Sequence, residues 1–470
     1  MCLYNTMTRQ KEPFETIEPG KVRMYVCGVT PYASAHVGHA MSGIVFDVIR
    51  RYLEHSGYEV RHATNFTDID DRIIASANRE GIDPSELTEE LIADWHRETE
   101  ALGILRATLY PRATQEIPAI IETIQGLIER GFAYSIDGDV YYRVREFAEY
   151  GKLSHRDLDE LLSGARIEVD ARKEDPLDFA LWKAAKPGEP SWPSPWSAGR
   201  PGWHIECSAM VSNHLDSVID IHGGGADLIF PHHENEIAQS EAYLGCKPFA
   251  RYWVHNGLLQ VGTDKMSKSI GNIVPTKELV DRGLGQAFRL LVLQSHYRAP
   301  LTYTEEGLEA AARGLDRLHA ATKPGGAIAA SNSSRSGEYL AAFADETDRR
   351  FHEAMDDDCD TPVAVAALFD LARAINRAKA EDGDPGTTEL AQSRLIALAG
   401  VLGLDLVGRE DQDGGAAAPF IDLLLDVRNH LRDAKQWALA DQIRDGLSKR
   451  GITIEDTSSG TTWRRADRYH

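Results

Sequence analysis

Three side chains that could take part in catalysis or ligand binding, Cys27, His36 and His39, lie within the single stretch Met24–Arg51. Alternating apolar residues up to Cys27 predict a strand, and apolar residues at helical spacing from His39 predict a helix. The loop between them follows the carboxyl end of the strand, where open α/β sheets bind ligands, and N–H groups at a helix start attract phosphate. The two histidines share one face there, and Gly38 leaves room for a flat ligand. On this stretch alone, a plain helix start with solvated histidines is an equal alternative.

A basic loop that could complete a phosphate site occurs much later, in the segment DKMSKS from Asp264 to Ser269. Its two cations, Lys265 and Lys268, could close over a triphosphate and neutralise charge as it moves to a leaving group. Taken alone, this loop could be a solvated basic turn. The earlier histidine pair makes that alternative weak.

Metal ligation is the other chemistry that the residue types suggest. Cys27 has no neighbouring thiol, so a CxxC knuckle is excluded, and the other candidates, Cys207, His232 and Glu236, are distant in the sequence. His232 and Glu236 are four residues apart, which on a helix lets them share an ion. Thiolate, imidazole and carboxylate together suit Zn²⁺. Spacing alone favours the plainer alternative of two buried thiols and a solvated HHENE segment.

The pairing of HVGH with KMSKS resembles the two signatures of class I aminoacyl-tRNA synthetases. The segment CGVTPYASAHVGHA, with others along the chain, resembles the cysteinyl-tRNA synthetase family from about residue 20 to the C-terminus. This resemblance implies one Zn²⁺ per chain, and its ligands would be Cys27, Cys207, His232 and Glu236. It also implies L-cysteine, ATP with Mg²⁺, and tRNA(Cys) as partners.

The resemblance further assigns roles in the pocket. Catalytic contacts to phosphate would come from His36, His39, Lys265 and Lys268. ATP would be bound by Gly38, His39, Gly224, Asp227 and Lys268. The cysteine substrate would lie beside Cys27, Thr67 and Trp203, although Trp203 could equally be a core residue. No role follows for His204 or His233.

A zinc ion would solve a problem of selectivity. Cysteine and serine differ by one atom, and a small pocket separates such near-isosteres by only about 1–3 kcal/mol. Zinc lowers the pKa of a bound thiol and prefers soft sulfur to a hydroxyl, so selection would happen at binding. A separate editing domain would then be unnecessary, and the sequence offers no segment for one.

The C-terminal end decides between three classes of function. Trp463 followed by Arg464 and Arg465 suits stacking on unpaired bases and contact with phosphate, unless the tryptophan seals a small core. The run ADQIRDGL, GITIEDT and GTTWR resembles the anticodon-binding end of cysteinyl-tRNA synthetases. The runner-up is an ATP-dependent ligase of cysteine to an amino sugar, of the mycothiol-pathway type, which lacks this tail. An inactive tRNA-binding paralogue is disfavoured because every catalytic motif is intact.

Composition sets outer limits on these interpretations. The net charge of −22 over 470 residues argues against a polyanion partner, yet the last thirty residues are rich in arginine, so RNA could still bind locally. Five scattered cysteines exclude a disulfide framework. No apolar run is long enough to cross a membrane. We expect a cytoplasmic monomer.

The order of elements favours a parallel sheet. We predict an α/β protein with a split Rossmann-like parallel-sheet catalytic domain and an inserted subdomain, followed by a helical domain and a small mixed C-terminal domain. The predicted boundaries are 1–112 and 200–262 for the catalytic halves, 113–199 for the insertion, 263–323 for the KMSKS loop and stem-contact region, 338–410 for the helical bundle, and 418–470 for the anticodon-binding domain.

Local patterns fill in this layout. Ile205 and Ile219–Ile221 predict strands, and Leu228–Leu244 predicts a helix. Two stretches rich in small residues, Pro324–Gly337 and Asp411–Pro419, predict links between domains.

Overall fold

The computed structural model describes residues 1–157, 172–261, 264–265, 273–324, 334–381, 384–407, 410–450, 452–457 and 460–465. The chain forms two compact units. The first comprises residues 1–280 and 284–404, and the second comprises residues 281–283 and 405–470.

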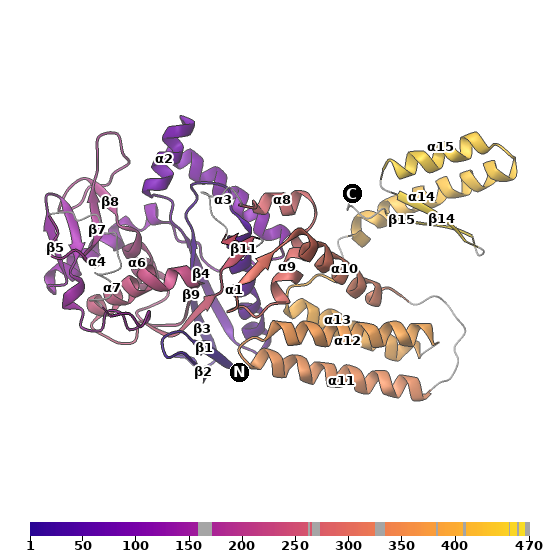
Figure 1. Ribbon diagram of the computed structural model, residues 1–470, viewed down its shortest axis with the longest axis horizontal. Helices are drawn as coiled ribbons and strands as arrows, with labels where there is room; N and C mark the ends of the chain where they lie inside the picture. The colour runs from indigo at the N-terminus through magenta and orange to yellow at the C-terminus, as the bar shows by residue number, and fades with distance from the viewer. Residues whose placement is uncertain are drawn as a thin grey trace. The chain divides into compact units, whose positions relative to one another are not determined.

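A four-stranded parallel sheet lies at the centre of the first unit (Figure 1). Its strands are β3 (Lys21–Val29), β4 (Glu59–Phe66), β9 (Ile219–Gly225) and β10 (Ala250–Asn256), in the order β10-β9-β3-β4. From β3 the chain continues outward to β4, and from β9 it continues in the other direction to β10. The carboxyl ends of β3 and β9 therefore form a topological switch point, where α/β sheets bind ligands.

Helices connect and cover these strands. They are α1 (Val37–His55), α2 (Asp71–Glu80), α3 (Pro84–Ala101), α6 (Trp203–His214), the short turns η3 (Ala226–Leu228) and η4 (Ile229–His233), and α7 (Glu234–Leu244). Helix α3 begins after Asp83, whose side chain accepts a hydrogen bond of 2.8 Å from the backbone N–H of Ser85. Such a cap satisfies one of the N–H groups that a helix start leaves without an intrahelical partner.

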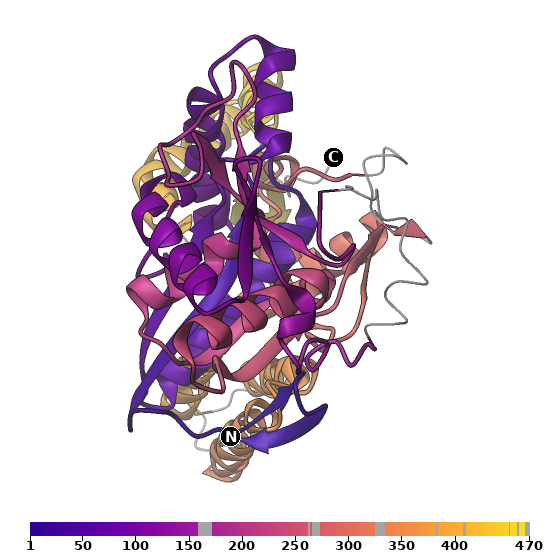
Figure 2. The same cartoon turned by 90° about the vertical axis from the view of Figure 1, so that its left-hand side faces the viewer.

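A second sheet interrupts the parallel fold between β4 and β9. It is antiparallel, with the strand order β5-β6-β7-β8. The segment contains η1 (Ala113–Gln115), α4 (Ile117–Glu129), β5 (Ala133–Ile136), β6 (Asp139–Tyr142), η2 (Val144–Glu146), β7 (Phe179–Ala184) and β8 (Gly199–Pro201). In Figure 2 the purple and magenta elements of this region face the viewer.

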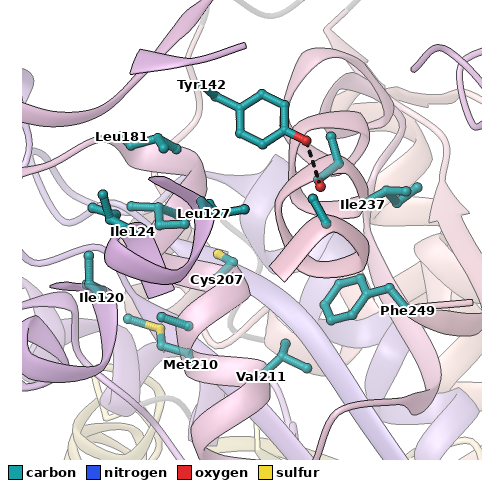
Figure 3. Packing of buried hydrophobic residues seen from close by; sticks show 14 of the residues in the cluster. Ile120, Ile124, Leu127, Tyr142, Leu181, Cys207, Met210, Val211, Ile237 and Phe249 are labelled. Atoms are coloured by element: carbon teal, nitrogen blue, oxygen red, sulfur yellow. Dashed lines mark hydrogen bonds between the residues drawn. The ribbon is translucent and has the colours of Figure 1, made fainter. Parts of the chain in front are cut away.

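One hydrophobic core joins the inserted segment to the parallel fold. Ile120, Ile124 and Leu127 of α4 belong to the same buried cluster as Met210 of α6 (Figure 3). The hydroxyl of Tyr142, also in this cluster, donates a hydrogen bond of 2.9 Å to the carbonyl of Ala238 in α7. The helices α6 and α7, which carry the predicted metal ligands Cys207 and Glu236, are thus held in place by packed apolar side chains.

The rest of the first unit consists of small sheets and helices. Residues at the N-terminus form β1 (Cys2–Asn5) and β2 (Gln10–Pro13). After β10 come β11 (Leu259–Val261), β12 (Asp264–Lys265), α8 (Thr276–Asp281), α9 (Gly285–Leu293), β13 (Leu301–Tyr303) and α10 (Glu305–Thr322). A helical bundle follows, with α11 (Ser334–Asp356), α12 (Thr361–Ala380) and α13 (Pro385–Val401).

A buried ion pair ties α1 to α9 and to the end of α13. Arg289 of α9 donates to the carboxylate of Asp47 in α1, and also to the carbonyl of Leu402 at 2.8 Å. Asp47 accepts two further hydrogen bonds of 2.8 Å, from Arg51 and from the backbone N–H of Leu105. Both charged side chains are buried, so each depends on the other for compensation.

The second unit is small and mixed. It contains α14 (Glu410–Asp433), α15 (Trp437–Ser448), β14 (Ile452–Thr457) and β15 (Gly460–Arg465), and the two strands form an antiparallel hairpin.

The split parallel-sheet fold predicted from the sequence is confirmed, but three local predictions were wrong. Ile205 lies in α6, because a short apolar run cannot distinguish a strand from a buried helix. Asp411–Pro419 lies within α14 and is not an irregular link. The helix predicted from Leu228 is interrupted at Phe230, whose φ of −140° and ψ of 132° are extended, so a regular helix begins only at Glu234. Most of the predicted Pro324–Gly337 link lies outside the described residues.

Candidate active site and metal centre

Cys27 lies near the carboxyl end of β3, at the switch point beside β9. The next residue, Gly28, has its backbone against that of Asn65, and a Cβ there would lie 1.7 Å from the Asn65 carbonyl oxygen. The N–H of Gly28 also donates to the side chain of Asn65 at 2.8 Å. Only glycine fits at this position, and this close approach fixes the direction of the Cys27 side chain.

The structure brings together all four residues predicted to bind metal. Donor atoms of Cys27, Cys207, His232 and Glu236 lie within 4.8 Å of one another. The two sulfurs are 3.8 Å apart, Cys27 Sγ is 3.4 Å from Glu236 Oε1, and His232 Nε2 is 3.0 Å from the same oxygen. The residues come from β3, α6, η4 and α7, so the sheet edge and two packed helices hold the set.

These separations fit a zinc ion. Zinc bonds of about 2.0–2.3 Å in tetrahedral geometry separate neighbouring ligand atoms by about 3.3–3.8 Å. The observed separations of 3.0, 3.4 and 3.8 Å lie in or near this interval. Two thiols with one imidazole and one carboxylate also match the ligand types that zinc prefers over magnesium or calcium.

A second, overlapping set could also hold a metal ion. It consists of Cys27, His222, His233 and Glu236. His222 donates to Glu236 Oε2 at 2.8 Å, whereas Cys27 and His232 approach the other oxygen, Oε1. Because the first set has two thiols and this one has only one, the first is the better zinc site, and His222 is placed to orient Glu236.

Sequence reasoning missed this shell of histidines. His233 Nε2 lies 3.3 Å from Cys27 Sγ, and His233 Nδ1 lies 2.7 Å from His255 Nε2. His204 Nδ1 lies 2.9 Å from His232 Nδ1. The only signal in the sequence was the presence of His222 in the glycine-rich strand exit and of two adjacent histidines in HHENE.

Burial and mutual contacts shift the pKa values of the four predicted ligands. A hydrogen bond from Cys27 lowers the pKa of Cys207 to about 6. Burial disfavours a charged His232, but Glu236 and Cys207 together raise its pKa to about 10. Burial raises the pKa of Cys27 well above its ordinary value. Metal ligation requires both thiolates and a neutral imidazole, so binding would release protons from Cys27 and His232.

Of the three residues predicted to lie beside the amino acid, Trp203 contacts this cluster and Thr67 contacts the helix that carries Cys207. The ring of Trp203 stacks on that of His232, with centroids 4.3 Å apart. Thr67 is buried, and its hydroxyl donates to Glu206 at 2.9 Å. Burial raises the pKa of Glu206 well above its ordinary value. Trp203 therefore supports a candidate ligand, and Thr67 is held by a carboxyl group on α6.

His36 and His39 stand at the start of α1, where their rings stack with centroids 3.7 Å apart. The backbone around His36 pairs with the segment just after the KMSKS motif: Val37 N–H donates to the Val274 carbonyl, and Thr276 N–H donates to the Ala35 carbonyl. Lys265 lies in β12, whereas Lys268 lies outside the described residues. The residues that follow the basic motif are therefore hydrogen-bonded to the chain on either side of His36.

The strand exit at β9 is crowded around Gly224, one of the residues predicted to bind ATP. A Cβ on Gly224 would lie 2.9 Å from the ring of His233 and from Leu228. Gly224 is buried, whereas Asp227 in η3 is exposed. Gly224 is therefore needed for packing against His233, and Asp227 is accessible to a ligand.

The predicted tRNA contacts lie in β15 of the second unit. Trp463 pairs in register with Ile454 and is half-buried, and its indole N–H donates to Asp422 at 2.8 Å. Arg464 and Arg465 follow it in the strand.

Comparison with known proteins defines the class first. Residues 13–313 match the family described as the tRNA synthetases class I (C) catalytic domain. The fold is similar to that of Mycobacterium tuberculosis methionyl-tRNA synthetase in complex with methionyl-adenylate, with a TM-score of 0.58 and 17% identity over 86% of this chain and 94% of that one. The fold and site are those of a class I aminoacyl-tRNA synthetase.

Two further matches and the full-length relatives identify the particular family. Residues 350–407 match the DALR domain, and residues 417–464 match the cysteinyl-tRNA ligase anticodon binding domain. Cysteine–tRNA ligase of Dehalococcoides mccartyi (strain BAV1) is 52% identical over 464 residues, covering 99% of both chains. That of Carboxydothermus hydrogenoformans is 48% identical over 469 residues, covering 99% of this chain and 100% of the relative. The chain belongs to the cysteine–tRNA ligase family.

Family membership confirms the predicted function and enzyme class, and it implies cysteine, ATP and tRNA as substrates. The amino-sugar ligase alternative is not favoured, because the anticodon-binding match is present. Across the described ranges, every helix is too short or too polar to span a bilayer.

Proposed function

We propose that this chain activates L-cysteine with ATP, transfers it to the 3′-terminal adenosine of tRNA(Cys), and selects cysteine through one zinc ion held by Cys27, Cys207, His232 and Glu236. The observation that carries this proposal is the convergence of these four donors, within 4.8 Å, at the switch point of the parallel sheet. The donors come from sequence positions up to 209 residues apart, and both the ligand types and the separations suit zinc.

When bound, zinc would supply a Lewis acid that takes the substrate sulfur as thiolate and discriminates against the serine hydroxyl. The residues of the chain keep this site in shape. His222 donates to the Glu236 oxygen that faces away from the thiols, and Trp203 stacks on His232. Partners of this kind orient metal ligands and maintain their affinity.

Adenylate formation joins the cysteine carboxylate to the α-phosphate of ATP and expels pyrophosphate. Such a displacement depends on positioning and charge neutralisation. We assign phosphate contacts to His36, His39, Lys265 and Lys268, with Gly38 allowing close approach and Mg²⁺ arriving with ATP. Adenosine would bind at Gly224 and Asp227, with the exposed Asp227 accepting from a ribose hydroxyl.

The division into domains follows this assignment. We propose catalytic halves at 1–112 and 200–262, an insertion at 113–199, a KMSKS and stem-contact region at 263–323, a bundle at 338–410 and an anticodon-binding domain at 418–470. In the last, Trp463, Arg464 and Arg465 would contact tRNA. We also propose that the chain is a monomer and functions in the cytoplasm.

Exchange of pyrophosphate into ATP tests the activation step. We expect exchange with cysteine, a far lower rate with serine, and none without an amino acid. Charging of tRNA(Cys) with labelled cysteine then tests transfer. If exchange with serine is as fast as exchange with cysteine, the proposal that zinc selects cysteine is wrong. If an amino sugar replaces tRNA as the acceptor, the assignment as a cysteine–tRNA ligase fails.

A further inference from the structure

A chain of buried hydrogen bonds connects the two elements that carry the thiols of the candidate zinc site. Cys27 belongs to β3, and Cys207 belongs to α6, 180 residues later in the sequence. Their sulfurs are 3.8 Å apart, which suits two ligands of one zinc ion. A site that is formed before the ion arrives needs β3 and α6 to be held at this distance.

The first part of the connection is a β-bulge at Cys27. Between two regular pairs of the β3–β4 ladder, Cys27 and Gly28 of β3 face the single residue Asn65 of β4. A bulge of this kind changes the direction of a side chain and interrupts the hydrogen bonds of the ladder. The N–H of Gly28 donates instead to the side-chain oxygen of Asn65, at 2.8 Å. Asn65 is buried, so this bond stabilises the bulge out of reach of water.

The second part joins Asn65 to α6 through Thr67. The amide nitrogen of the Asn65 side chain donates to the Thr67 hydroxyl at 3.3 Å, and that hydroxyl donates to Glu206 Oε2 at 2.9 Å. Glu206 lies in the first turn of α6, directly before Cys207. The connection therefore runs from the residue after one thiol to the residue before the other.

Each member of this connection depends on its neighbour. Thr67 and Glu206 are buried, and within the described ranges Glu206 Oε1 has no hydrogen-bond partner, so the Thr67 hydroxyl is what Glu206 bonds to. The backbone N–H of Thr67 also donates to the carbonyl of Val29, just beyond the bulge, at 3.2 Å. Buried polar groups are costly unless they are bonded, and a bonded network favours one arrangement of its elements.

We propose that Asn65 and Glu206, bridged by Thr67, position the two thiols of the zinc site and so maintain its preference for cysteine over serine. This positioning role rests on the proposed function, because it requires zinc at these thiols. If the spacing is lost, zinc binds less tightly, and a chain with less zinc lacks the metal that distinguishes sulfur from oxygen. Residues that orient metal ligands typically contribute about 10- to 100-fold to metal affinity.

The first test measures the Kd of the full chain for zinc by competition with a chelator, without cysteine or ATP. Thr67→Val removes the bridging hydroxyl, whereas Thr67→Ser keeps it. Thr67 is also assigned to the cysteine pocket, but a lost substrate contact cannot change zinc binding when the substrate is absent. We expect a Kd raised about 10- to 100-fold in Thr67→Val and in Asn65→Ala, and a Kd close to that of the wild type in Thr67→Ser.

The second test compares two buried glutamates that anchor opposite ends of α6. Glu206 bonds near the start of the helix, whereas Glu116 accepts hydrogen bonds of 2.7 Å from Asn213 and His214 at its end. Glu206→Ala should raise the Kd for zinc about 10- to 100-fold and weaken the thiolate-to-metal absorption band of the cobalt-substituted chain. Glu206→Gln, which can still accept from Thr67, should restore both. Glu116→Ala is the matched control, and its zinc affinity and cobalt spectrum should equal those of the wild type.

Pyrophosphate exchange without added zinc then measures selectivity, and the ratio of the rate with cysteine to the rate with serine should fall in Asn65→Ala and Glu206→Ala. Wild-type zinc affinity in either variant would overturn the proposal, as would an equal loss in Glu116→Ala, because the effect would then be a general one on α6. If Glu206→Ala does not fold, the comparison of Thr67→Val with Thr67→Ser decides. Absence of zinc from the wild type would instead refute the proposed function.

Discussion

In the pocket around Cys27, polar side chains are buried and bonded to one another, whereas in the unit of residues 405–470 large apolar side chains lie on the surface. Glu236, His222 and His233 are fully buried, and each has a polar partner within 3.9 Å. In the second unit, by contrast, Phe420 is 70% exposed and Trp437 is 56% exposed.

This difference indicates where each region obtains its specificity. Buried polar groups are costly unless every partner is in place, so the pocket tolerates little displacement. Exposed aromatic groups can stack on bases that arrive from solution, at little cost to the fold. The first region is suited to recognising one sulfur atom, and the second to recognising a large, irregular polymer.

Removing residues 405–470 is expected to give the largest effect. Cysteine-dependent pyrophosphate exchange should remain near the wild-type rate, because all residues assigned to adenylate chemistry precede the cut. Charging of tRNA(Cys) should be abolished or greatly weakened. Normal charging by the truncated chain would show that the second unit is not needed for recognition.

Lys268→Ala should lower the rate of adenylate formation by about 10- to 100-fold and leave cysteine binding nearly unchanged, because its charge is needed mainly as pyrophosphate departs. Single-turnover exchange and equilibrium binding of cysteine measure the two effects. Lys277→Ala, an exposed lysine in α8, is the matched control. Equal losses in rate and in cysteine affinity would contradict a role in the transition state.

Asp47→Asn tests whether a buried charge outside the pocket also needs its partner for the stability of the fold. It leaves Arg289 buried without its carboxylate, which should lower the free energy of unfolding by about 3 kcal/mol. Asp216→Asn, which breaks an exposed pair with Arg23, should cost under about 1 kcal/mol. Urea unfolding near neutral pH measures both.

The buried pair of Asp47 and Arg289 also predicts how the stability of the protein depends on pH. Burial opposes ionisation of Asp47, but Arg289 and Arg51 lower its pKa below the ordinary value. A carboxyl group with a lowered folded pKa stabilises the protein above its unfolded pKa, and this stabilisation is lost as pH falls through the folded pKa. The stability difference between wild type and Asp47→Asn should therefore be full above about pH 4 and shrink below it. A difference that grows on acidification would refute this assignment.

Trp463→Ala should give the smallest effect, a rise in the KM for tRNA with the KM for cysteine unchanged, and a loss of at most about 1–3 kcal/mol. Its indole also bonds to Asp422, so Asp422→Ala is the matched variant, which removes the hydrogen bond and keeps the ring. If both variants raise the KM for tRNA equally, Trp463 acts through local packing and not through stacking on a base.

The sequence predicted the parallel sheet, because strand and helix periodicity are local signals, whereas the set of four ligands followed from the resemblance to the synthetase family and not from spacing. It could not predict that His222 and His233 surround Glu236, since that depends on the pairing of β9 with β3 and on the interrupted helix at Phe230. The strand prediction at Ile205 was wrong for the same kind of reason. Burial on all sides in α6 removes the amphipathic pattern by which helices are recognised.

The zinc content of the purified chain tests whether Cys27, Cys207, His232 and Glu236 bind a metal ion. We expect one zinc per chain in the wild type, in Cys246→Ser and in His222→Ala, and strongly reduced zinc in Cys207→Ser. His222→Ala separates the two overlapping ligand sets, because only the second set needs that imidazole as a ligand. Absence of zinc from the wild type, or unchanged zinc in Cys207→Ser, would show that these four residues do not form a zinc site.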